Sequence, residues 1–202
     1  MSRIAVDVVL LPDEAMTARA IKINAELVKR FGTKIELNKE NCLPHISLAM
    51  GCIEEGNITA IGKVLEKIAT ETSLPDLKVV GVRTSGNSKG EKVSVYEVEK
   101  TKQLQSLHEM VCDKLSAVFS SDVTEDMICG GEEVAESTLL WIKNYREKVS
   151  FENFFPHITI GYGQIENHAL PASFAASELA LCHLGNHCTC RKVLVSIKLE
   201  GM

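Results

Sequence analysis

Two short segments of this chain have the residue types and spacing to do chemistry. Residues 44–48 read Pro-His-Ile-Ser-Leu, and residues 156–160 read Pro-His-Ile-Thr-Ile, 112 positions later. In an extended strand, side chains alternate between faces, so each histidine and the hydroxyl two residues later point the same way. Two such strands facing each other would present His45, Ser47, His157 and Thr159 to one cleft. This pattern predicts a phosphate-binding site.

Imidazole and hydroxyl groups in this arrangement suit reactions at phosphorus. Cleavage of a phosphodiester needs a base for the attacking oxygen and an acid for the leaving oxygen. Imidazole titrates near neutral pH, so His45 and His157 can each take either role. The hydroxyls of Ser47 and Thr159 can hold the non-bridging oxygens as these gain charge. The chemistry needs no metal and no cofactor, and the sequence leaves open which histidine is the acid.

A single Pro-His pair on an apolar strand is more often structural than catalytic. The duplication favours function, because a purely structural histidine has no need of a small hydroxyl two residues later. We therefore interpret the two motifs as a pair.

The segments around the motifs predict the elements that position them. Residues 3–11 form a β-branched run that ends at Pro12, and Asp13 can cap a helix that ends at Gly32. The motif strands are expected at 43–52 and 156–162. Further helices are expected at 57–71, 102–120 and 135–148, with Leu139, Leu140 and Ile142 inward in the last. Hairpins are expected at 77–99, turning at 85–90, and at 178–199, turning at 185–186.

This order of elements predicts an α+β fold in one bilobal domain, residues 1–202. Each half places its motif strand ahead of a terminal hairpin, which indicates two pseudo-symmetric lobes, roughly 1–100 and 101–202. Exchange of strands between the lobes stays open. Each lobe is expected to be an antiparallel sheet with helices on the outside, and the active cleft should lie between them.

Four further residues are candidate substrate contacts. Tyr96, on the central hairpin, could stack on a base, whereas Tyr162 points away from the cleft unless a glycine bends its strand. Core packing is the competing role for both tyrosines. Arg83 and Arg191 are candidate phosphate clamps, although exposed strand arginines are usually just solvated.

The segment 182–190 contains five cysteines and histidines, which could suggest a metal site. It has no Cys-x2-Cys unit and already fits a hairpin, so we interpret it as buried thiols and surface imidazoles, and we predict no metal.

The charge balance limits the partners. With 22 Lys and Arg against 27 Asp and Glu, the net charge is −5, which gives no field that attracts a long polyanion. This argues against duplex DNA as a partner, whereas a small nucleotide or a short RNA needs only a few local donors. No feature of the sequence fixes an oligomeric state.

The cysteines and the hydropathy pattern indicate the compartment. Seven cysteines form an odd set, and no apolar signal segment opens the chain, which predicts free thiols in a reducing interior. No run approaches the roughly 20 apolar residues that span a bilayer. We therefore expect a cytoplasmic protein that does not enter the membrane.

The paired His-x-Ser and His-x-Thr motifs resemble those of the 2H phosphoesterase superfamily, which includes RNA 2',5'-ligase-like proteins and cyclic phosphodiesterases. The first strand from Arg3 to Pro12 and the closing 179–199 hairpin are also similar to that family. The resemblance implies that His45 and His157 are acid and base and that Ser47 and Thr159 bind phosphate. Ser47 replaces the commoner threonine, which keeps the donor and loses a methyl group.

These patterns lead to one main hypothesis and two alternatives. The main hypothesis is a metal-independent phosphodiesterase that acts on a nucleotide or short RNA end, with a 2',3'-cyclic phosphate, a 2',5' linkage or a related cyclic ribose phosphate. The first alternative is a nucleotide-binding or RNA-end-binding module without turnover. The second is a structural or docking protein, in which the motif faces would be occluded.

Overall fold

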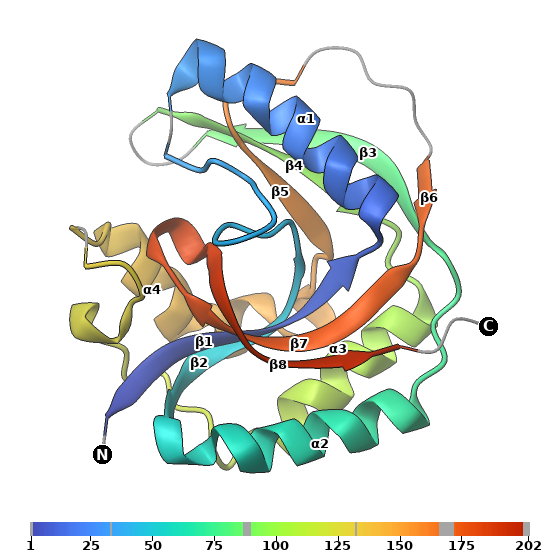
Figure 1. The fold of residues 1–202 in the computed structure, drawn as a ribbon, viewed down its shortest axis with the longest axis vertical. Helices are drawn as coiled ribbons and strands as arrows, with labels where there is room; N and C mark the ends of the chain where they lie inside the picture. Colours follow the sequence, from blue (N-terminus) through green and yellow to red (C-terminus); the bar gives the residue numbers. More distant parts are fainter. Residues whose placement is uncertain (1, 33, 87–89, 132, 166–171, 200–202) are drawn as a thin grey trace.

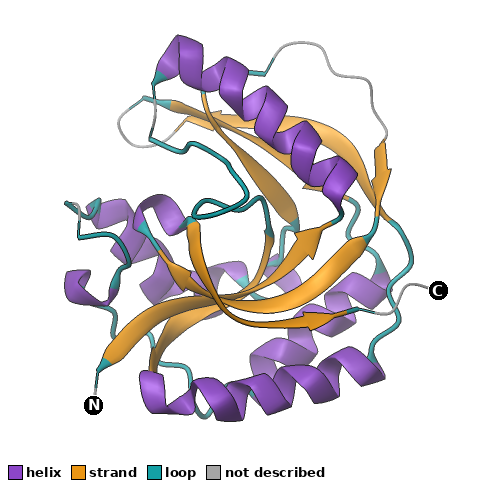
Figure 2. Ribbon diagram, viewed as in Figure 1, coloured by secondary structure: helices purple, strands orange, loops and turns teal. Residues whose placement is uncertain are grey.

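The structure is a computed structural model that describes residues 2–32, 34–86, 90–131, 133–165 and 172–199. Part of the turn expected at 85–90 lies outside these residues. The chain forms two curved antiparallel sheets of four strands each, with helices on their outer sides (Figure 1). Figure 2 shows the two sheets facing each other across the middle of the molecule. The expected α+β class with two sheet lobes is confirmed.

The first sheet contains the strand that follows His45, and we call it the His45 sheet. Its order is β2-β1-β7-β8, with β1 (Arg3–Pro12), β2 (Ile46–Glu54), β7 (Ala176–Leu184) and β8 (Cys190–Lys198). Strand β1 is central and buried along nearly its whole length. An almost unbroken apolar run suits a strand that is covered on both faces.

The second sheet begins with the other motif strand, and we call it the His157 sheet. Its order is β5-β4-β3-β6, with β5 (His157–Tyr162), β4 (Lys92–Val98), β3 (Leu77–Gly86) and β6 (Ala172–Phe174). The sequence did not predict β6, because three residues are too few to show a periodicity.

Helices cover the outer face of each sheet. Helix α1 (Glu14–Phe31) packs on the His157 sheet, while α2 (Ile58–Glu71) and α3 (Lys102–Lys114) pack on the His45 sheet (Figure 1). Asp13 caps α1 by accepting a hydrogen bond from the Met16 backbone N–H at 2.8 Å. The apolar spacing of these helices fits their one-sided burial.

The third and fourth helices differ from expectation. Helix α3 ends at Lys114 rather than near residue 120, because Ser120 exchanges backbone hydrogen bonds with Cys52 of β2. Helix α4 (Glu136–Asn144) continues as a π-helical turn, Tyr145–Val149. Leu140 is exposed rather than inward.

The sheets do not divide at residue 100. The C-terminal hairpin of β7 and β8 pairs with β1, and the central hairpin of β3 and β4 pairs with β5. Each sheet therefore combines strands from both halves of the chain. The two sheets do not correspond to residues 1–100 and 101–202, because each half contributes a hairpin to the sheet that holds the motif strand of the other half.

The same irregularity occurs beside both motifs. In the His45 sheet, the register shifts between Val8 and Val9, which makes Leu48 the extra residue of a β-bulge. In the His157 sheet, the shift lies between Ser94 and Val95, and the extra residue is Ile160. Because both bulges follow the motif hydroxyl, the two sheets can be aligned residue by residue at the site.

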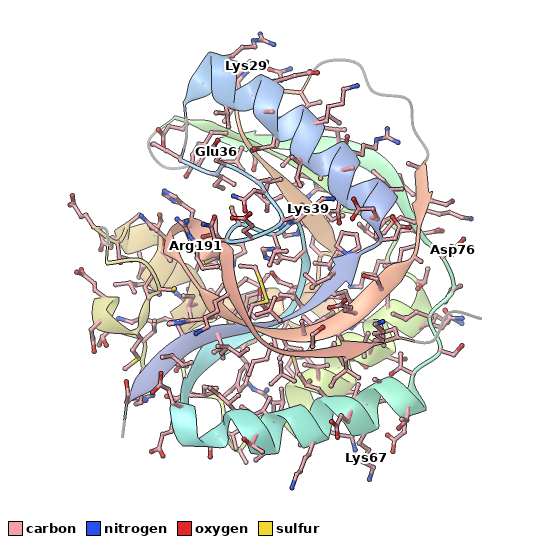
Figure 3. All side chains as sticks on the ribbon, in the orientation of Figure 1. Lys29, Glu36, Lys39, Lys67, Asp76 and Arg191 are labelled. Carbon is pink, nitrogen blue, oxygen red and sulfur yellow. A yellow bond between two sulfur atoms is a disulfide. The ribbon has the colours of Figure 1, made fainter. Side chains whose placement is uncertain are left out.

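The cysteines are not all free. Cys182 and Cys190 form a disulfide between β7 and β8, seen as the yellow bond in Figure 3. The expectation of free thiols throughout was wrong for this pair. Among the described residues, no helix is long and apolar enough to cross a membrane.

Candidate active site

A cavity of about 290 Å³ lies where the two motifs meet. All four motif side chains, His45, Ser47, His157 and Thr159, line it. The rest of the wall is mainly apolar and aromatic, and includes Ile35, Leu37, Met50, Val93, Trp141, Tyr145, Phe154, Phe155 and Tyr162. The structure thus brings together two pairs of residues that are remote in sequence.

Both imidazole rings are held in the same way. His45 Nδ1 lies 2.7 Å from the Leu43 carbonyl oxygen, and His157 Nδ1 lies 2.8 Å from the Phe155 carbonyl oxygen. A carbonyl oxygen only accepts, so Nδ1 carries the proton in each ring. The Nε2 atom of each ring is therefore the one that can exchange a proton with a ligand.

The two rings lie in a low-dielectric environment. Burial and, to a smaller extent, the proximity of His157 lower the pKa of His45, whereas the Leu43 carbonyl opposes them, and the resulting pKa is about 4. Burial also lowers the pKa of His157, and the positive charge of Arg83 acts in the same direction. Both rings are therefore set up to be neutral at pH 7 in the absence of another charge.

The bulges decide which residues beyond the motifs reach the cavity. Strict alternation would turn Tyr162 away, but the extra residue Ile160 shifts the phase, so Tyr162 lines the cavity. Gly161 has φ +145°, a conformation that side chains disfavour. Met50 reaches the cavity by the same shift in the His45 sheet.

The other three candidate substrate contacts do not line the cavity. Tyr96 is fully buried in the core, on the opposite face of β4, so it is not placed to stack on a base. Arg83 pairs with Glu97 at 2.6 Å and lies over the Phe155 ring beside the cavity. Arg191 donates from Nε to the Thr189 hydroxyl at 3.1 Å, at the start of β8 (Figure 3).

The Cys/His hairpin contributes to the cavity rather than forming a site of its own. Cys182 and Cys190 are joined to each other, while His187 lines the cavity and packs edge-on against Tyr162, with ring centroids 5.6 Å apart. His187 is half-buried, so its imidazole is only partly at the surface. Within the described ranges, no three His, Cys, Asp or Glu side chains gather as metal ligands.

Sequence reasoning missed three residues at or below the wall. Trp141 and Tyr145 come from α4 and the turn that follows it, and the Tyr145 hydroxyl donates to the Ser47 carbonyl at 3.3 Å. The sequence predicted their helix, but its weak apolar pattern did not indicate that these two aromatic side chains face the cavity. Asp7 lies in the middle of β1, and the only signal was a single charge in a run of aliphatic residues.

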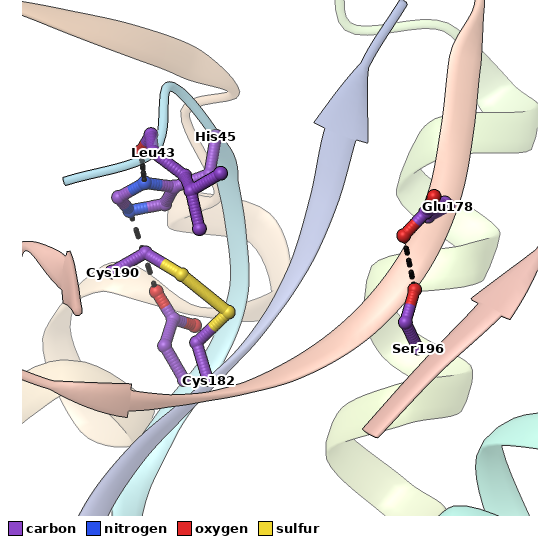
Figure 4. Close-up of a disulfide and its surroundings, with 7 residues drawn as sticks. Leu43, His45, Glu178, Cys182, Cys190 and Ser196 are labelled. Carbon is purple, nitrogen blue, oxygen red and sulfur yellow. Dashed lines mark hydrogen bonds and ion pairs between the residues drawn. A yellow bond between two sulfur atoms is a disulfide. The ribbon is translucent and has the colours of Figure 1, made fainter. Parts of the chain in front are cut away.

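Asp7 is fully buried beneath His45. Its Oδ2 atom lies 3.9 Å from His45 Nε2, and Figure 4 shows this ring with its dashed contacts beside the disulfide. Burial raises the pKa of Asp7 well above the usual value. The Ser47 hydroxyl and the Ala49 N–H oppose that shift, although neither completes a well-formed hydrogen bond to the carboxyl group.

The fold is that of known solved structures. The crystal structure of TT0787 of Thermus thermophilus matches with a TM-score of 0.54 at 14% identity, over 98% of this chain and 99% of that one. The crystal structure of E. coli LigT in apo form matches with a TM-score of 0.51 at 13% identity, over 98% of each chain. Both matches extend over nearly the whole chain, so this protein shares its fold with these two proteins. No protein-family profile and no curated protein sequence matches the chain.

Proposed function

We propose that this protein is a metal-independent phosphodiesterase that acts on a nucleotide or a short RNA end. The observation that carries the proposal is the identical fixing of two imidazoles in one cavity, each with Nδ1 on a carbonyl and Nε2 available. Ser47 and Thr159 line the same cavity beside them. The LigT-like fold supports the same class of reaction.

The residues are suited to an in-line displacement at phosphorus. One imidazole takes a proton from water as the water oxygen bonds to phosphorus. The bond from phosphorus to a ribose oxygen breaks, and the second imidazole gives that oxygen a proton. Ser47 and Thr159 donate to the non-bridging oxygens, whose charge grows in the transition state. For the substrate we propose a 2',3'-cyclic phosphate, a 2',5' linkage or a related cyclic ribose phosphate.

The cavity wall favours one nucleoside over a long polymer. Its volume of about 290 Å³ and its aromatic residues, Trp141, Tyr162 and Phe155, suit a base that stacks on a side chain. The net charge of −5 gives no general attraction for a duplex. We therefore propose a small nucleotide or short RNA as partner, in the cytoplasm.

A panel of substrates tests the proposal. The protein is incubated with 2',3'-cyclic nucleotides, 2',5'-linked dinucleotides and 3',5'-linked dinucleotides, in the presence of EDTA, and the products are identified by chromatography. We expect turnover of at least one of the first two groups and little of the third. Activity that EDTA abolishes and a divalent metal restores would contradict the metal-independent mechanism.

The alternative is a binding module that captures the same phosphate without turnover. The buried neutral state of both rings is compatible with it, because hydroxyls alone can hold a phosphate. His45→Ala separates the two functions. An enzyme keeps much of its nucleotide affinity and loses turnover, whereas a binder shows no turnover before or after the change on any substrate of the panel.

A further inference from the structure

The buried carboxyl of Asp7 has no role in the mechanism described so far. The side chain has 0% exposure, and neither oxygen makes a well-formed hydrogen bond to any described residue. An ionised carboxylate in such a place is strongly unfavourable unless it is compensated. The nearby group that can exchange a proton with it is His45, with 3.9 Å between Oδ2 and Nε2.

Burial favours opposite protonation states in Asp7 and His45, so a single proton is enough to keep both groups neutral. Burial favours the protonated form of Asp7 and the unprotonated form of His45, so their pKa values move in opposite directions. With both deprotonated, a buried negative charge would face the Nε2 lone pair. With one proton between them, the pair is neutral overall, whichever group holds it.

The equivalent position in the other sheet has no such group. In the His45 sheet, Asp7 lies two residues before Val9, the residue that follows the register shift, and Asp7 pairs with Met50. In the His157 sheet, the residue two before Val95 is Val93, which pairs with Tyr162. His157 therefore lacks a buried acid where His45 has one, and the charge that acts on it is the cation of Arg83.

We propose that Asp7 is a positioning residue that shares one proton with His45, so that His45 acts as the general acid and His157 as the general base during hydrolysis. This assignment rests on the proposed function. The cavity wall includes His45 but not Asp7, so a bound phosphate lies closer to the ring. Its negative charge draws the shared proton onto Nε2, where the leaving oxygen can take it.

The other titratable groups around the pair do not take over this role. Tyr145 comes from the π-helical turn, Cys188 from the β7–β8 turn and Cys112 from α3, and burial raises the pKa of each. All three are therefore neutral at pH 7. His157, from β5, faces His45 and disfavours a second positive charge, so protonation of one ring keeps the other neutral.

NMR of the ligand-free protein tests the shared proton without any measurement of activity. Samples labelled at histidine nitrogen and aspartate Cγ are followed at pH 7, before and after addition of inorganic phosphate. We expect the pair to hold one proton throughout, with phosphate shifting it to His45 Nε2. An ionised Asp7 next to a neutral His45 in the wild-type protein, with and without phosphate, would overturn the proposal even if no variant folds.

Asp7→Asn removes the shared proton and keeps the shape of the side chain. In this variant, phosphate should no longer protonate His45 at pH 7, and kcat should fall about 100-fold with little change in KM, because general acid catalysis contributes that much or more. The loss should diminish toward pH 5. Asp113→Asn, which changes an exposed carboxyl on α3, is the matched control.

A thio-substituted substrate identifies the acid. Thiolates leave without protonation, so a cyclic phosphate with sulfur in place of the leaving ribose oxygen should restore most of the activity of Asp7→Asn and His45→Ala. It should not restore His157→Ala. Equal rescue of all three variants, or rescue of His157→Ala alone, would overturn the assignment.

Different results would contradict the proposed function and the proposed role of Asp7. If no substrate of the panel is turned over, the proposed function fails, while NMR can still show the shared proton. If turnover is found, but Asp7→Asn keeps the wild-type pH profile and phosphate still protonates His45 in this variant, only the proposed role of Asp7 is wrong.

Discussion

The His45 and His157 sheets use the same backbone device and differ in what surrounds it. Each has a motif strand, a bulge one residue after the hydroxyl, and a histidine fixed through Nδ1. At equivalent positions, the His45 sheet has Asp7 and Met50 where the His157 sheet has Val93 and Tyr162. In the mechanism that we propose, the backbone would supply the symmetry of an in-line reaction, and these few side chains would supply the difference between acid and base.

The largest effects should come from removing either imidazole. His45→Ala and His157→Ala should each lower kcat about 1000-fold, since each contributes one proton transfer. The double variant should be little worse than either single variant, because the two groups act as a unit. Steady-state kinetics on the best substrate of the panel measures this. Full additivity would indicate two independent contributions.

The next largest effect should be a difference between the two bulges in how much a substitution there lowers the free energy of unfolding. A Cβ on Gly161 would lie 2.7 Å from Asn24 Nδ2, and φ is +145° there. Asn24 is buried and bonds to the carbonyls of Ile160 and Ile35. Gly161→Ala should lower the free energy of unfolding by about 3 kcal/mol.

Ala49 occupies the equivalent place in the His45 sheet, so Ala49→Gly is the matched control. It should cost only about 1 kcal/mol. Urea denaturation compares the two variants, and an equal loss would mean that the bulges are equivalent in strain.

The covalent link is found in the His45 sheet. The Cys182–Cys190 disulfide closes a short loop, with a sequence separation of 8, for which the chain-entropy relation gives about 2.5 kcal/mol. Reduction should therefore lower Tm by roughly 5–10 °C for a chain of this size. A thermal melt with and without reductant checks this, with Cys182→Ser as the control that should not respond. An unchanged Tm in the wild-type protein would contradict the expectation.

The smallest and sharpest effect should come from copying the acidic group to the other sheet. In Val93→Asp, a carboxylate near His157 raises the pKa of that ring, so the base is free only at higher pH. The acidic limb of the kcat/KM profile should move upward, with about a tenfold loss at pH 6. Val93→Asn adds polarity without charge and should leave the limb in place. A limb that moves equally in both variants would rule out an electrostatic cause.

Much of this arrangement could be predicted from the sequence because it depends on local pattern. The helices and most strands follow from apolar spacing and capping residues, and the duplicated motifs indicated His45, Ser47, His157 and Thr159 as one set. The exchange of hairpins between sheets could not be predicted, because strand pairing depends on contacts between segments far apart in the chain.

The errors at the site have physical causes as well. A bulge changes the alternation of β5, so Tyr162 enters the cavity, whereas Tyr96 lies on the regularly alternating β4 and faces the core. Asp7 is a charge within an apolar strand, and its meaning depends on which histidine the fold places 3.9 Å away. Spacing alone carries neither kind of information.

The exchange of hairpins has a consequence for biosynthesis. A ribosome delivers β1 and β2 early, but the other edge of β1 pairs with β7, which emerges more than 160 residues later. Until then the nascent chain exposes a long apolar strand edge, which invites aggregation. We therefore expect newly made chains to depend on chaperones until residues 176–184 leave the exit tunnel.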